Sequence, residues 1–118
     1  RNSTMSIQKI VPSGSTNGKP IKVVATATLG TTFHTAAAGT AGVDEVTMFL
    51  SNTDTVDRAV TVEFGGVSSP DNLMKFSVPA GDSILAVPGI PIQNSLAVTV
   101  FAAAAQVITM WGHVNRIS

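Results

Sequence analysis

Two histidines are the side chains in this sequence best suited to acid–base or metal chemistry. His34 lies in the segment TTFHT and His113 in the segment MWGHV, and neither has an acidic neighbour in the sequence. A catalytic histidine needs an acid or a nucleophile within hydrogen-bond reach, and a metal site needs further ligands. Because the sequence places no such partner nearby, we interpret both histidines as structural or surface residues.

Acidic residues gather in the segment DTVDRA and in the pair Asp44-Glu45. A calcium loop alternates oxygen ligands and ends in a bidentate glutamate, a pattern that DTVDRA does not match. We expect Asp54, Asp57 and Arg58 to solvate a turn or to pair with another chain. We expect Asp44-Glu45 on an exposed strand edge, where charge prevents unwanted pairing. The sequence therefore predicts no metal site and no cofactor.

Other catalytic patterns do not occur. Gly65-Gly66 lacks the lysine and the following helix of a phosphate-binding loop. No nucleophile elbow, zinc-protease motif or paired-carboxylate motif is found in the sequence. The chain has no cysteine, which excludes thiol catalysis and disulfides. We therefore predict a protein that is not an enzyme.

Charge is low and balanced. Seven basic residues offset seven acidic ones, and charged residues make up 12% of the 118-residue chain, about half of the usual share. Nucleic-acid binding requires a basic face, so we expect no nucleic-acid partner. No run of 18 apolar residues occurs, so we expect no membrane partner. A neutral, charge-poor surface favours association with other protein chains.

The elements that must position these residues are strands. Valine and threonine are abundant, and both favour a pleated, half-buried surface. The sequence predicts strands over 21–30, 31–39, 46–51, 60–64, 73–78, 84–87, 95–101 and 106–114. Turn residues separate them at intervals of about 8–12 residues, which is typical of sandwiches and barrels. We predict an all-β, antiparallel β-sandwich of jelly-roll type with about eight strands.

The sharpest pattern is VTMFLSNTDTVDRAVTVEF, residues 46–64. Alternation places Val46, Met48 and Leu50 on one face, and oxygen-bearing side chains fill the insert that follows. We predict a hairpin here. Residues 88–91 (PGIP) are not expected in a central ladder, because proline lacks the donor.

The first 20 residues differ from the rest. Residues 1–20 are polar and turn-rich, with one apolar patch at residues 7–11. We predict an N-terminal arm and linker over 1–20 and a β-sandwich domain over 21–118. An extended arm can add a strand to a neighbour's sheet through backbone hydrogen bonds.

The segments VDEVTMFLSNTDTVDRAVTVEFGG, LMKFSVPAGDSILAVPGIPI and SLAVTVFAAAAQVITMWGHV, in this order, carry a family resemblance. Residues 29–117 resemble small β-sandwich virion proteins of tailed bacteriophages, most of all head decoration (cement) proteins. The N-terminal arm departs from this pattern. The resemblance rests on turns and strand order and includes no catalytic signature.

The resemblance implies a structural virion protein on the capsid surface, made in the host cytoplasm. It implies the major capsid protein as partner, and we expect a homo-oligomer, a trimer. Neck, tail or fibre protein is the alternative, followed by a host-receptor or carbohydrate-binding module. The predicted interface residues are Ile7, Ile10, Val11, Asp54, Asp57, Arg58, Pro88, Ile90 and Pro91. Ile90 and Ile92 are expected to be exposed between prolines unless a partner covers them.

Overall fold

The computed structural model describes residues 5–118, so the first four residues of the predicted arm lie outside the described part. Nine strands form it: β1 (Ile7–Ile10), β2 (Ile21–Lys22), β3 (Thr31–Thr35), β4 (Val43–Asn52), β5 (Arg58–Phe64), β6 (Leu73–Val78), β7 (Ser83–Ile92), β8 (Ala97–Ala102) and β9 (Ile108–Ile117). The described residues include no helix. The prediction of an all-β chain is confirmed.

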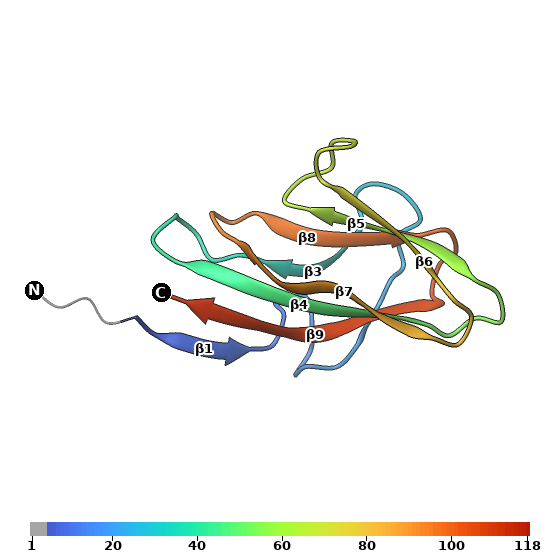
Figure 1. Cartoon of the computed structure of the whole chain (residues 1–118), viewed down its shortest axis with the longest axis horizontal. Helices are drawn as coiled ribbons and strands as arrows, with labels where there is room; N and C mark the ends of the chain where they lie inside the picture. Colours follow the sequence, from blue (N-terminus) through green and yellow to red (C-terminus); the bar gives the residue numbers. More distant parts are fainter. Residues whose placement is uncertain (1–4) are drawn as a thin grey trace, which may run out of the picture.

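The strands form two antiparallel sheets that face each other (Figure 1). One sheet has the order β1-β9-β4-β7, with β2 also paired to β9, and the other has the order β3-β8-β5-β6. The buried apolar side chains of both sheets form one core. The fold is therefore a β-sandwich-like arrangement of two layers.

The strand pairs are nested along the chain. β5 pairs with β6, β4 with β7, β3 with β8, and β2 with β9, all antiparallel. The chain thus behaves as one long hairpin whose tip lies between β5 and β6. Wrapping this hairpin into two layers brings β9 beside β4 and β8 beside β5.

The hairpin predicted over 46–64 is wrong. β4 and β5 lie in different sheets, so the insert between them crosses from one layer to the other. Both edges of β4 are occupied by β7 and β9, and both edges of β5 by β6 and β8. The Asn52 side chain holds the crossing, because its amide donates to the carbonyl oxygens of Val56 and Val78.

The strand predicted over 21–30 is also mostly wrong. Only Ile21–Lys22 pairs with β9, and the chain then leaves the sheet. The backbone N–H groups of Val24 and Ala25 both donate to Thr31 Oγ1, which gives this segment a local partner in place of a strand. A side-chain acceptor thus replaces the ladder that alternation predicted.

β7 contains the segment 88–91 that was not expected in a central ladder. β7 is the edge of its sheet, where the missing proline donor faces no strand. A register shift between Val46 and Thr47 accommodates Gly89, whose φ of 73° suits glycine. Ile90 packs against the core and Ile92 is 6% exposed, so their predicted exposure is wrong.

The predicted core faces largely agree with the structure. Val46, Met48 and Leu50 are fully buried. Alternation within the strand predicted over 95–101 puts Leu96 on the same face as the buried Val98 and Val100, but Leu96 is 47% exposed because it precedes β8. The side of the sheet that a residue faces therefore follows alternation within strands and departs from it at strand ends.

Candidate interaction surface

The outward-facing side of the five-stranded sheet is a surface to which several of the predicted interface residues contribute. Side chains alternate across a strand, so the neighbours of the buried Val46, Met48 and Leu50 point away from the core. The strand registers then align these outward residues in rows across β1, β9, β4 and β7. We call this surface the outer face; it comprises Ile7, Lys9, Lys22, Val43, Glu45, Thr47, Phe49, Ser51, Ser83, Leu85, Pro88, Pro91, Thr109, Trp111, His113, Asn115 and Ile117.

The outer face is poor in charge and holds exposed apolar groups. Its only charged side chains are Lys9, Lys22 and Glu45. Ile7 is 60% exposed and Leu85 is 49% exposed. Apolar groups exposed on a sheet with few charges are typical of a surface that contacts another protein.

The sequence-predicted interface residues separate into three groups. Ile7, Pro88 and Pro91 lie on the outer face, and Val11 directly follows β1. Ile10 and Ile90 point inward and pack against the core. Asp54, Asp57 and Arg58 lie in and beside the connection from β4 to β5. The structure therefore does not gather the nine residues into one patch.

An aromatic pair that is not among the nine predicted interface residues lies in the middle of the outer face. The rings of Phe49 and Trp111 are directly opposite in β4 and β9 and stack with centroids 4.4 Å apart and planes 13° apart. Trp111 Nε1 donates to Ser51 Oγ at 2.8 Å, and Leu85 lies opposite Phe49 on β7. The outward alternation of both aromatics was the signal in the sequence. Stacked rings of this kind are rigid anchors at protein interfaces.

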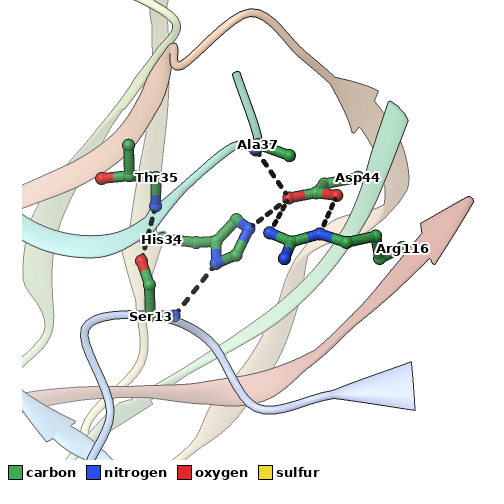
Figure 2. Close-up of polar contacts among 6 residues, drawn as sticks. All are labelled: Ser13, His34, Thr35, Ala37, Asp44 and Arg116. Carbon is green, nitrogen blue, oxygen red and sulfur yellow. Dashed lines mark hydrogen bonds and ion pairs between the residues drawn. The ribbon is translucent and has the colours of Figure 1, made fainter. Parts of the chain in front are cut away.

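His34 and Asp44 form a buried polar cluster between the two sheets (Figure 2). His34 Nε2 lies 2.7 Å from Asp44 Oδ2, and both residues are 1% exposed. Arg116 donates to both carboxylate oxygens of Asp44 at 2.9 Å, and the Ala37 N–H donates to Oδ2 at 3.2 Å. The expectation that Asp44 lies on an exposed edge is wrong, because its side chain points inward opposite Ile92 and Arg116.

The hydrogen bonds of Ser13 and His34 in this cluster join segments of the fold and do not form a catalytic arrangement. The backbone N–H of Ser13 donates to His34 Nδ1 at 3.0 Å, so the imidazole accepts at Nδ1 and donates from Nε2 to Asp44. The Ser13 hydroxyl oxygen instead accepts from the Thr35 N–H at 2.7 Å. A hydrolytic triad requires the serine hydroxyl on the imidazole, and here the serine contributes its amide. The cluster ties the segment before β2 to β3, β4 and β9.

The Asp44 carboxyl group is strongly acidic. The hydrogen bond from Arg116 is the largest cause, burial opposes it, and the contacts with His34 and the Ala37 N–H add to it. Together they lower the pKa of Asp44 from 3.8 to about 2. Asp44 is therefore ionised at neutral pH, and its negative charge holds Arg116 in place.

Glu63 is a second buried carboxylate, in the other sheet. It is fully buried and accepts hydrogen bonds from Thr28 Oγ1 at 2.6 Å, Thr99 Oγ1 at 2.6 Å and the Gly30 N–H at 2.8 Å. Burial raises the pKa of Glu63, but the three hydrogen bonds outweigh burial and the net pKa is lowered. Two of the donors flank Leu29, so Glu63 holds the chain on both sides of this exposed residue.

A shallow cavity of about 220 Å³ lies beside Glu63. Aliphatic side chains and glycines line most of it: Leu29, Gly65, Gly66, Val67, Leu96 and Ala97, with Ser95 and Thr99. Its polar atoms are few, and the Thr99 hydroxyl is already committed to Glu63. The cavity offers space for aliphatic groups.

Asp54 and Arg58 form a local ion pair. Arg58 Nε donates to Asp54 Oδ2 at 2.8 Å and its Nη2 contacts the same oxygen. The Arg58 hydrogen bond is the main cause of a lowered pKa at Asp54. Asp57 Oδ1 accepts from the Ala80 N–H at 3.0 Å, which joins the β4–β5 and β6–β7 connections. These contacts agree with a role in solvating and fixing the turn.

Residues 5–118 show neither a metal-binding cluster nor a membrane-spanning helix. No group of three or more His, Cys, Asp or Glu side chains in this range is placed to hold a metal ion. No helix in the same range is long and apolar enough to cross a membrane. Comparison with protein-family models, curated protein sequences and solved structures finds no match.

Proposed function

We propose that this protein is a non-enzymatic structural component of a virion, a capsid decoration (cement) protein. In this proposal it binds the outside of the major capsid protein lattice, as a trimer, and stabilises the head. The observation that carries the proposal is the outer face, a broad sheet surface with three charged side chains and a central stacked aromatic pair. An interface of about 800 Å² per partner suffices for specific binding.

We further propose that the strand order is a jelly roll. The nested pairs β2–β9, β3–β8, β4–β7 and β5–β6, wrapped into two sheets, support this assignment. Jelly rolls are an architecture of viral capsid domains and also of lectins. The sequence resemblance to phage virion proteins favours the first of these two classes.

The proposed mechanism is interface burial. The outer face lies against the capsid, so that Leu85, Phe49 and Trp111 are removed from water. The buried clusters around Asp44 and Glu63 stabilise the sandwich and do not contact the partner. Many copies on one shell give avidity to a contact that is weak for one copy.

The test is to add purified protein to capsids stripped of accessory proteins and to image them by cryo-electron microscopy. The proposal predicts regular density on the capsid surface with the outer face turned toward the shell. Bare capsids, with the protein present only at the portal or tail of intact particles, would assign it to the neck, tail or fibre instead.

A further inference from the structure

We infer that residues 5–11, which include β1, are exchanged between copies of this chain. In the exchanged form, β1 of one copy pairs with β9 of a second copy in the same antiparallel register. This inference does not depend on the virion role, because it concerns the purified chain alone.

The first observation is that this segment contributes little to its own core. Met5, Ile7 and Val11 are 66%, 60% and 50% exposed, and only Ile10 packs against the core. The segment is held instead by backbone pairing along the edge of β9, extended by two hydrogen bonds between Ser6 and Ser118. β1 is thus held mostly by backbone hydrogen bonds and little by its side chains.

The second observation is that the residues directly after the segment are held firmly by the rest of the molecule. Pro12 is buried, and the Gly14 N–H donates to the Phe33 carbonyl oxygen at 2.9 Å. Ser13 is fixed twice, by its N–H on His34 and by its hydroxyl oxygen, which accepts from the Thr35 N–H (Figure 2). The body of the molecule therefore begins at Pro12, and Val11–Pro12 is the natural hinge.

The third observation concerns the site that β1 occupies. β1 lies at the edge of its sheet, and among residues 5–118 its one partner strand is β9 (Figure 1). Its removal breaks no other strand pair, and seven extended residues reach about 23 Å from the hinge.

Exchange preserves the pairing and adds new contacts. Every copy carries the same β9 edge, so the pairs Ile7–Ile117 and Lys9–Asn115 form equally well between two chains. Because the register is unchanged, Ile7 keeps its outward position, and the new contacts form where the two chains cross, beside Val11, which is 50% exposed in the closed form. Burial of Val11 at this crossing favours exchange over the closed form.

A disulfide trap tests the inference. The chain has no native cysteine, so only the introduced cysteines can form disulfides. Lys9 and Asn115 are directly opposite on the outer face, a spacing that suits a disulfide. The variant Lys9→Cys/Asn115→Cys is oxidised after folding and its mass is measured without reductant. Exchange predicts that most chains are joined to another chain, and closed monomers predict that nearly all disulfides lie within one chain.

The matched control is Lys22→Cys/Thr109→Cys, a directly opposite pair on the same β9 but beyond the hinge. This disulfide is expected to lie within one chain. Disulfides between chains in the control would overturn the hinge at Pro12, because exchange would then extend past it.

A second measurement uses single variants. Lys9→Cys chains and Asn115→Cys chains are unfolded together, refolded and oxidised. Exchange predicts a disulfide between the two different chains. If no such product forms, and the double variant contains only disulfides within one chain, the inference is wrong.

Discussion

The imidazole of His34 and the carboxylate of Asp44 connect the two sheets through a contact of 2.7 Å between Nε2 and Oδ2. His34 belongs to β3 of the four-stranded sheet and Asp44 to β4 of the other. Both side chains are shielded from water, and Arg116 of β9 completes the charge balance. The cluster therefore fixes one end of the sandwich where apolar packing gives way to polar groups.

Removing the shared carboxylate is expected to destabilise the fold. Asp44→Ala leaves Arg116 without its partner and His34 Nε2 without an acceptor, which costs about 3 kcal/mol. Urea unfolding should show a lower midpoint with an unchanged slope. The control Glu45→Ala alters the neighbouring outward residue and should change stability by less than about 0.5 kcal/mol. Equal effects of the two substitutions would contradict the role of the cluster.

Stability should fall in acid. The folded pKa of Asp44 is about 2 and the ordinary value is 3.8, so the unfolded chain binds the proton more tightly. The resulting stabilisation is present above about pH 5, amounts to about 2 kcal/mol, and is lost as pH falls toward 2. The lowered pKa of Glu63 acts in the same direction.

Urea unfolding at pH 7 and at pH 3 measures this loss, and Asp44→Asn removes the Asp44 contribution. The variant should therefore lose less stability between the two pH values than the native chain does. An identical loss in both proteins would show that Asp44 does not carry the acid sensitivity.

Glu63 should control the loop that precedes β3. Glu63→Ala removes the acceptor of the Gly30 N–H and of two threonine hydroxyls, so unfolding should become easier by about 3 kcal/mol. Hydrogen exchange at the Gly30 amide should accelerate at least tenfold, beyond the change at the Val98 amide of neighbouring β8. A uniform acceleration across both amides would indicate a global effect with no specific hold on the loop.

The sequence predicted the layers of the fold better than the connections between them. Alternation identified β6 with its observed bounds, and in the strand predicted over 106–114 it puts Ile108, Met110 and Val114 on one face, which is buried. It failed for residues 46–64, because alternation specifies which side of a strand is buried and not which strand lies beside it. The pairing of β4 with β7 and β9 depends on residues more than 30 positions away.

The buried polar clusters could not be predicted from the sequence for a similar reason. His34 and Asp44 are ten residues apart and on different sheets, so neither spacing nor periodicity indicates their contact. Alternation within the strand predicted over 60–64 places Glu63 on the side away from Val62 and the core, yet Glu63 is fully buried because loop residues 28–30 cover it. The outward position of Phe49 and Trp111 follows from the sequence, since both alternate with buried residues, but their stacking on each other does not.

Sugar binding is the prediction that separates a lectin-like module from a structural protein. Each ring of the Phe49–Trp111 pair has one face covered by the other, and Trp111 Nε1 is already bonded to Ser51. We expect Trp111 fluorescence to stay constant when mono- and oligosaccharides are titrated. Phe49→Ala, which uncovers one indole face, is the control that shows the fluorescence is sensitive to ring contacts. A saturable change in the native chain would favour the carbohydrate-binding alternative.

The central claim is that the outer face binds a capsid lattice, and one binding measurement tests it most directly. Leu85→Lys places a charge on the outer face directly opposite Phe49, at a side chain exposed enough to tolerate it in the free protein. Val67→Lys introduces the same charge at a similarly exposed position beside the cavity, away from the outer face. Co-sedimentation with stripped capsids should show at least tenfold weaker binding for Leu85→Lys and native binding for Val67→Lys. Native binding by Leu85→Lys, or no binding by the unaltered chain, would contradict the account.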